Sequence, residues 1–251
     1  KRTLILYPLS QKELSSVYTR YELKEKLQDF LVFGTYPEVV TAKTRKEKIE
    51  ILEELVSSYL LKDILAIDKI RSSRTLFDLL KLLSFQVGNL VSLSELAGQL
   101  KVDVKTVGRY LDLLEKSFVI KKIQGFSQNL RKEITSKAKY FFVDNGIRNG
   151  VISQYNPLDL RNDIGNLWEN FIVMERIKKL TFDREMPVSF YFWRTYCGQE
   201  IDLVEQREQG LFAYECKYSQ QKIKLPKTWA KNYPHSHFTV ITKDNYLDFL
   251  L

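Results

Sequence analysis

The sequence predicts a mixed α/β fold in which helices come first and strands dominate the last third. Three observations support this. Apolar residues recur at steps of three and four in the first third, as in amphipathic helices. Two short helical segments followed by strand-like segments fill the middle. One long apolar helix then precedes four strand-like segments at the end. We expect three parts, residues 1–72, 73–150 and 151–251, with a mixed central sheet in the last.

The composition indicates a folded protein with an acidic partner. Of the 251 residues, 44% are hydrophobic and 13% aromatic, which allows real cores and argues against disorder. The net charge of +8 makes nucleic acid the first candidate partner. Cys197 and Cys216 form no CxxC pattern, and His235 and His237 do not supply a familiar zinc spacing. With no membrane-spanning run and no signal-peptide pattern, we expect a cytoplasmic protein with reduced cysteines and no membrane partner.

The N-terminal part is predicted to be helical. The chain opens with Lys1 and an apolar strand-like run, so we expect that a preceding portion is missing. Ser10 and Glu13 form the S-x-x-E pattern of a capping box, which starts a helix. A helical pattern covers residues 45–65. We interpret this part as a helical linker that follows a missing domain.

The middle part begins with a helix expected from residue 73 to about residue 85, and a helix-turn-helix pattern follows it. Ser92 or Ser94 can cap a short helix that runs through Leu100. A turn at residues 101–103 precedes a second helix, which ends at about residue 118 and has apolar residues on one face. Two short helices joined by a tight turn are typical of a helix-turn-helix motif.

Two strands and a basic charge follow this motif. Residues 119–123 alternate, and the segment AKYFFVDNG is a second strand that Asn145-Gly146 closes as a turn. This order indicates a winged helix. Residues 101–139 hold ten basic and four acidic residues, a difference of +6, which is the electrostatic pattern of a duplex-binding module. The alternatives are a protein-docking winged helix and a solvated basic face. The candidate DNA contacts here are Lys101, Lys105, Arg109, Lys121 and Lys122.

The last part is predicted to be an α/β domain. A polar, turn-rich segment, SQYNPLDLRND, marks its beginning. The helix IGNLWENFIVMERIKKL is apolar on two sides and is therefore expected to be buried. The strands SFYFWRT, EIDLVEQ, LFAYECKYS and FTVITK follow, with a helix allowed before the last. Between those two strands, Lys222 and Lys224 belong to a basic stretch that could follow a phosphate backbone or form a solvated helix face.

Charged residues within these strands indicate a site. Residues two apart in a strand share a face, so Glu215 and Lys217 point the same way, and strand pairing can bring Asp202 beside Glu215. Two carboxylates held together repel unless a proton or cation intervenes, and Mg²⁺ prefers carboxylate oxygens. Glu169 lies on the buried helix upstream. The alternative is a cross-strand salt bridge of Asp202 or Glu215 with Lys217.

The set of Glu169, Asp202 and the triplet Glu215-Cys216-Lys217 resembles the PD-(D/E)XK nuclease superfamily. The order of helix and strands is similar to the Holliday-junction-resolvase-like core, which implies a restriction-endonuclease-like domain. Ile201 stands where the superfamily's namesake motif has proline. The resemblance implies Mg²⁺ or Mn²⁺ as cofactor, with Asp202, Glu215 and Glu169 as metal ligands. It also implies a catalytic set in which Lys217 positions the attacking water; that set is Glu169, Asp202, Glu215 and Lys217.

A wider resemblance covers nearly the whole chain. It rests on the segments FLVFGTYPEVV, SYLLKDI, YFFVDNGIRN, GNLWENFIVMERI and GQEIDLV with YECK. These segments resemble a family of prokaryotic AAA+ ATPases whose C-terminal half carries an uncharacterised domain. The resemblance implies that an ATPase domain precedes the segments seen here. This sequence lacks the pattern G-x-x-x-x-G-K-[ST], so no ATP-binding residues are expected in it, and ATP enters only through the missing N-terminal domain.

The functional expectation is therefore a DNA-associated C-terminal region of an AAA+ ATPase, with Mg²⁺-dependent phosphodiester cleavage. One alternative is a nuclease fold that is catalytically inactive and binds DNA or protein. Another is a regulatory arm that docks the missing ATPase domain. The expected partners are DNA, the ATPase domain and, as an open alternative, further copies of the chain.

Overall fold

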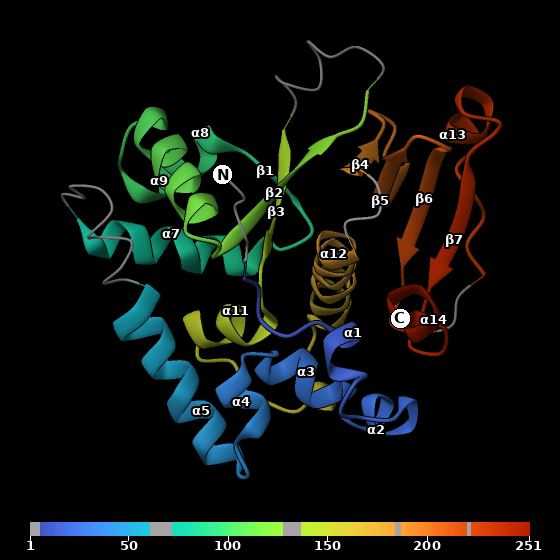
Figure 1. Ribbon diagram of the computed structural model, residues 1–251. Coiled ribbons are helices and arrows are strands. Elements are labelled where there is room, and N and C mark those ends of the chain that lie inside the picture. Colours follow the sequence, from blue (N-terminus) through green and yellow to red (C-terminus); the bar gives the residue numbers. More distant parts are fainter. Residues whose placement is uncertain (1–5, 61–71, 128–136, 184–186, 220–221) are drawn as a thin grey trace, which may run out of the picture.

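The N-terminal helices gather at one end of the molecule, while other helices lie beside a sheet in which the described residues form seven strands (Figure 1). The computed structural model describes residues 6–60, 72–127, 137–183, 187–219 and 222–251. The expected α/β class, with a mixed sheet and a helical N-terminal segment, is confirmed. Most of the apolar run at the start of the chain, and the end of the helix expected at 45–65, lie outside the described residues.

Short helices with strong N-terminal caps build the N-terminal segment. Capping boxes begin three of them, formed by Ser10 with Glu13, Thr19 with Glu22, and Thr44 with Glu47. Each box satisfies backbone N–H groups that a helix start otherwise leaves unpaired. The elements are α1 (Gln11–Leu14), α2 (Arg20–Glu25), α3 (Leu27–Phe33), α4 (Pro37–Thr41), α5 (Arg45–Glu54) and a π-helical turn, η1 (Leu55–Leu60).

The middle of the chain forms helices that pack beside three strands. Ser92 caps α8, and the Asp103 carboxylate caps α9 by accepting from the Thr106 N–H group at 2.8 Å. Between them, Lys101 takes the left-handed conformation that ends α8. The elements are α7 (Ser73–Phe85), β1 (Leu90–Val91), α8 (Leu93–Leu100), α9 (Val104–Lys116), β2 (Ile120–Gly125) and β3 (Ala138–Phe142).

The turn expected at Asn145-Gly146 is a helix start. These residues begin α11 (Asn145–Val151), and the Asp144 carboxylate accepts from the Ile147 N–H group at 3.1 Å. An aspartate directly before the pair supplies an N-cap, which stabilises a helix in place of a hairpin turn.

The C-terminal part has the expected order of elements and one more helix. α12 is long and mostly buried, and the four strands follow with α13 before the last. The final helix, α14, was not predicted. The elements are η2 (Leu158–Leu160), α12 (Ile164–Asp183), β4 (Ser189–Arg194), β5 (Glu200–Arg207), β6 (Gly210–Cys216), α13 (Lys227–Asn232), β7 (His237–Ile241) and α14 (Tyr246–Leu250).

The sheet is continuous across the boundary expected near residue 150. Its strand order is β1-β3-β2-β4-β5-β6-β7. Two of its pairings are parallel, β2 with β4 and β6 with β7, and the others are antiparallel. The β2–β4 pairing joins the middle of the chain to its C-terminal part at Gln124 and Tyr191. α12 packs against β3 and β6, and Figure 1 shows it between the two halves of the sheet.

Asn170 fixes α12 against β3. Its side chain accepts from the Phe142 N–H group at 2.8 Å and donates to the Phe142 carbonyl at 2.9 Å. It also donates to the Asn145 side chain at 2.7 Å. These bonds satisfy the backbone N–H and C=O groups of Phe142, at the end of β3. They set the position of the neighbouring residue on α12, Glu169.

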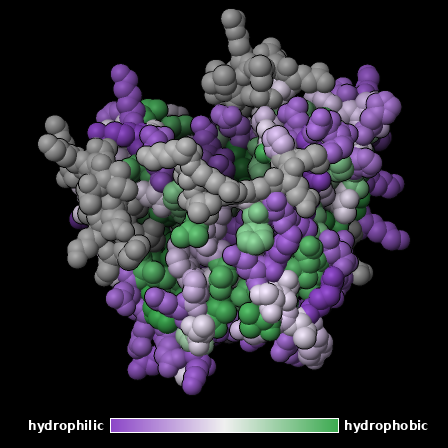
Figure 2. All heavy atoms as spheres, in the orientation of Figure 1, coloured by the Kyte–Doolittle hydropathy of each residue, from purple (hydrophilic) through white to green (hydrophobic). Residues whose placement is uncertain are grey.

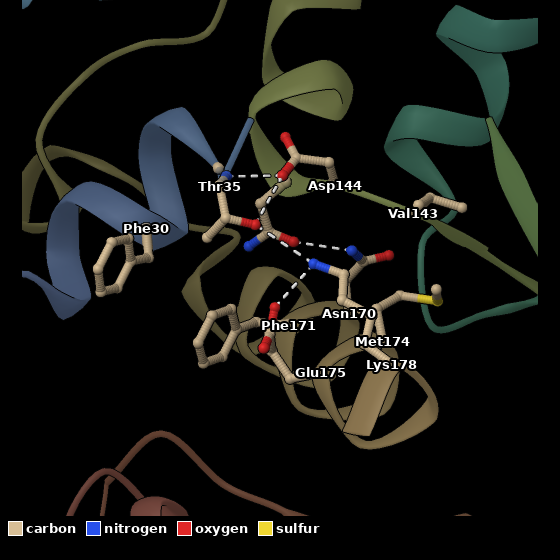
Figure 3. A pocket seen from close by; sticks show the side chains of 11 residues that line it. Phe30, Thr35, Val143, Asp144, Asn170, Phe171, Met174, Glu175 and Lys178 are labelled. Atoms are coloured by element: carbon tan, nitrogen blue, oxygen red, sulfur yellow. Dashed lines mark hydrogen bonds and ion pairs between the residues drawn. The ribbon is translucent and has the colours of Figure 1, made fainter. Parts of the chain in front are cut away.

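A second set of buried polar groups joins α12 to the N-terminal helices (Figure 3). The Asp144 carboxylate accepts from the Thr35 N–H group at 2.7 Å, and Lys178 donates to Glu175 at 2.8 Å. Burial raises the pKa of both Asp144 and Glu175, although the charge of Lys178 opposes that shift. A cavity of about 10 Å³ lies among these side chains, about enough for one water molecule. This cluster therefore packs the helices together and has no room for a substrate.

Candidate carboxylate–lysine site

Asp202 takes its direction from an irregularity in β5. The pairing of β4 with β5 shifts between Tyr191–Val204 and Trp193–Ile201, which places one extra residue in β5. Ile201 and Val204 therefore pack in the same small core although they are three residues apart. The Asp202 carboxylate accepts from the Cys216 N–H group of β6 at 2.8 Å. The bulge thus turns a carboxylate toward the end of the neighbouring strand.

Glu215 and Lys217 meet Asp202 at this point. Lys217 Nζ lies 2.7 Å from Glu215 Oε1 and 3.7 Å from Asp202 Oδ2. The Lys217 backbone N–H group donates to the Ile241 carbonyl of β7 at 2.9 Å, which fixes the backbone beyond β6. The structure therefore brings together Asp202, Glu215 and Lys217, through the salt bridges that were the alternative interpretation of their spacing.

Glu169 reaches the same cluster through a lysine of β3. Lys139 Nζ lies 2.9 Å from Glu169 Oε1 and 4.0 Å from Asp202 Oδ1. It also lies 2.6 Å from Glu200 Oε1, at the start of β5. The Lys139 side chain is only 1% exposed. All four expected site residues therefore belong to one network, which we call the carboxylate–lysine site: Lys139, Glu169, Glu200, Asp202, Glu215 and Lys217.

Sequence reasoning missed Lys139 and Glu200 as members of this site. In the sequence, Lys139 contributes only to the basic charge of residues 101–139. Glu200 is only the first residue of the predicted strand EIDLVEQ. The signal that points to Lys139 is its place in the apolar strand AKYFF, because a lysine there needs a buried partner. Its partners belong to another part of the chain, so the sequence pattern does not identify them.

The electrostatics of the site reflect burial and an excess of acid. Burial, with Asp202 adding to it, raises the pKa of Glu169 to about 8 against the opposing charge of Lys139. Burial and the charge of Asp202 also raise the pKa of Glu215. Burial alone would lower the pKa of Lys139, but its carboxylate neighbours outweigh that effect and raise it. Among the described residues, the cationic partners of the four carboxylates are Lys139, Lys217 and Arg194, and Arg194 lies 3.2 Å from Glu200.

This donor set has the chemistry that Mg²⁺ or Mn²⁺ prefers, because it offers several carboxylate oxygens around a shortage of positive charge. Among the residues that the structure describes, no three His, Cys, Asp or Glu side chains are grouped so that they could hold a metal ion. The two ammonium groups lie between the carboxylates instead. The Lys217 side chain is 32% exposed and borders solvent.

The loop after α7 covers Glu169. Gly88 has a φ of 76°, and a Cβ atom there would lie 2.5 Å from Glu169 Oε2. The Asn166 side chain donates to the Val87 carbonyl at 2.6 Å and ties this loop to α12. A side chain at position 88 would therefore collide with the carboxylate, in a backbone conformation that favours glycine.

The basic residues expected to contact DNA are on other segments of the chain than the members of this cluster. Lys101, Lys105 and Arg109 are exposed along α8 and α9. Lys121 is held by Glu115, whose carboxylate also accepts from the Lys122 N–H group. Lys222 and Lys224 are exposed in the segment between β6 and α13. Figure 2 shows hydrophilic residues interspersed with small hydrophobic patches over the face seen in Figure 1.

No helix within the described ranges has both the length and the apolar character to cross a membrane.

Three uncharacterised proteins are similar in sequence to this chain. One from Haemophilus influenzae is 29% identical, over 98% of the chain and 58% of its own length. One from Mycobacterium tuberculosis is 25% identical, over 73% of the chain and 41% of its own length. One from Methanocaldococcus jannaschii is 24% identical, over 65% of the chain and 36% of its own length. The chain thus spans roughly a third to three fifths of these relatives. No solved structure matches it significantly.

Two families of unknown function match separate parts of the chain. The domain of unknown function DUF4143 matches residues 164–248, a range that contains every member of the carboxylate–lysine site except Lys139. The domain of unknown function DUF8612 matches residues 24–158, which contain Lys139 and the helices beneath α12. Because the second match covers more than half of the chain, this protein belongs to the DUF8612 family.

Proposed function

We propose that the carboxylate–lysine site is a metal-dependent phosphodiesterase centre that acts on DNA. The observation that carries this proposal is the meeting of Asp202, Glu215 and Lys217 at the ends of two adjacent strands. Glu169 joins them from α12, through Lys139. This set resembles that of the PD-(D/E)XK superfamily, which supports the proposal that the C-terminal part is a restriction-endonuclease-like domain.

Each side chain has a role in this proposal. Asp202 and Glu215 would hold Mg²⁺ or Mn²⁺, and Glu169 would contribute a further carboxylate to the negative charge around it. A bound ion would act as a Lewis acid toward the scissile phosphate. Lys217, displaced toward solvent, would carry a positive charge to a water molecule or to a phosphate oxygen. The buried position of Asp202 between the lysines keeps the acidic groups in place before substrate arrives.

The rest of the chain would bring DNA to this site. The helices α8 and α9 with β2 and β3 are proposed to form a winged helix, and the exposed lysines of α8 and α9 would contact phosphates. The wider resemblance and the greater length of the relatives support an AAA+ ATPase domain elsewhere in the whole protein. ATP would act there and not in this chain.

A second candidate function is DNA or protein binding by an inactive nuclease fold. One observation favours it. Lys139 and Lys217 already neutralise the carboxylates by direct contact, at 2.6–2.9 Å for three of the ion pairs. Such a cluster is stable without a metal ion and would then support the sheet alone.

A cleavage assay distinguishes the two functions. Plasmid, branched and single-stranded DNA would be incubated with the protein in Mg²⁺ or Mn²⁺. We expect cleavage by the wild type, and a loss of at least about 100-fold in Lys217→Ala and Asp202→Asn, because charge stabilisation at such sites contributes factors of that size. Lys46→Ala, a change to an exposed lysine of α5, serves as the matched control and should cut at the wild-type rate. Equal cleavage by all four proteins would indicate a contaminating nuclease, and no cleavage of any DNA would favour the binding function.

A further inference from the structure

Asp202 is shared by two cationic side chains. On one side, Lys217 Nζ lies 3.7 Å from Oδ2 and pairs with Glu215. On the other side, Lys139 Nζ lies 4.0 Å from Oδ1 and pairs with Glu169 and Glu200. Each ammonium group therefore occupies a position among carboxylate oxygens where a metal ion could otherwise bind.

The two positions differ in how easily the ammonium group can leave. The Lys217 side chain is about one third exposed and follows the end of β6, so it can turn into solvent. Lys139 is fully enclosed, and its strand is paired on both sides, at Leu90 of β1 and Ile123 of β2. Its ammonium group also lies 5.6 Å from the centre of the Phe192 ring. Moving it would leave Glu169, whose side chain is 14% exposed, without its ion-pair partner, which is unfavourable.

We propose that Lys139 is a built-in cation that permanently fills one of two metal positions in this site. It is a positioning residue contributed by β3, outside the part of the chain that carries the acids. As a consequence, the site binds one divalent ion fewer than its carboxylates could bind. The inference that a single ion binds at Asp202 and Glu215 rests on the proposed function. The role of Lys139 does not depend on that function.

Counting bound Mn²⁺ tests this proposal. The free Mn²⁺ signal in electron paramagnetic resonance would be followed during titration of the wild type, Lys139→Met and Lys46→Met. Methionine has nearly the volume of lysine and no charge, and Lys46→Met removes the same charge from an exposed site. We expect one ion in the wild type and in Lys46→Met, and two in Lys139→Met. An equal count in the wild type and Lys139→Met overturns the proposal.

A second variant keeps the proposal testable if Lys139→Met does not fold. The double change Lys139→Met with Glu200→Gln removes one of the carboxylates that the lost lysine contacted. Glu169 and Asp202 still offer oxygen ligands, so we expect the additional ion to bind with lower affinity. Circular dichroism would check the fold of each variant. A count no higher than that of the wild type in this double variant would also overturn the role of Lys139.

The counts separate this proposal from the proposed function. A wild type that binds no Mn²⁺, together with one ion in Lys139→Met, would support the role of Lys139 and contradict the metal-dependent activity. A wild type that binds one ion, together with one in Lys139→Met, would support the metal site and contradict the role of Lys139.

Discussion

Asp202 shows how a single residue gains its function from the backbone around it. In a regular strand, Asp202 and Val204 would face the same side of the sheet. The bulge between them turns Asp202 away from the small aromatic core that Val204 joins, so its carboxylate meets the Cys216 N–H group and two lysines. Bulges often redirect a side chain beside a site.

At the same scale, Glu175 makes stability depend on pH. Burial, with the charge of Asp144 adding to it, raises the pKa of Glu175 in the folded protein above its unfolded value, although Lys178 opposes the shift. The carboxyl group therefore contributes stability that is fully present below the unfolded pKa and is lost as pH rises through the folded pKa. The difference in free energy of unfolding between the wild type and Glu175→Gln should fall as pH rises above about 4.

Denaturant unfolding at a series of pH values would measure this difference. Each unit of pKa shift corresponds to about 1.4 kcal/mol. Glu50→Gln, a change on the exposed side of α5, serves as the control for the loss of one carboxylate. Parallel curves for the wild type and Glu175→Gln across the pH range would contradict the prediction.

At the scale of elements, the proposed DNA binding can be tested on α9. Its buried face includes Val107 and Tyr110, whereas Lys105 and Arg109 lie on its exposed side, four residues apart. Contacts to phosphates release counterions, so affinity for duplex DNA should fall with salt. We expect Lys105→Ala and Arg109→Ala each to weaken binding and to lower the salt slope by about one.

Fluorescence anisotropy with labelled duplexes between low and moderate salt would give these slopes. Lys46→Ala should keep the wild-type slope, since it lies on an N-terminal helix away from α9. A wild-type affinity that does not change with salt would remove duplex binding as a role of this element.

At the scale of the whole molecule, the middle and C-terminal parts share one sheet. A fragment of residues 151–251 would lose the β2 neighbour of β4, the Phe142 partner of Asn170 and the Lys139 partner of Glu169. Removing β3 also uncovers the face of α12 that packs against it, and each Å² of apolar surface returned to water costs about 25 cal/mol. We expect this fragment to unfold at a clearly lower temperature than the full chain. Thermal unfolding followed by circular dichroism checks this, and equal melting temperatures would contradict it.

The same scale separates what the sequence could predict from what it could not. Helix starts such as Ser10 and Ser92 were predictable, because a cap and the helix it begins are local. The pair of Glu215 and Lys217 was predictable from its two-residue spacing. The partners of Lys139 were not, because they depend on the parallel pairing of β2 with β4, which no turn or short loop specifies. The prediction of a turn at Asn145-Gly146 was wrong, because the aspartate before this pair caps a helix.

The position of Lys139 has a consequence for how the two matched regions evolve together. The acids of the site fall within the region that DUF4143 matches, whereas the lysine that contacts three of them falls within the region that DUF8612 matches. A gene rearrangement that joined the acidic region to an unrelated upstream module would leave Glu169 without its counter-charge and Glu200 with Arg194 alone. The two regions therefore depend on each other chemically, and we expect them to occur together in the same protein chains.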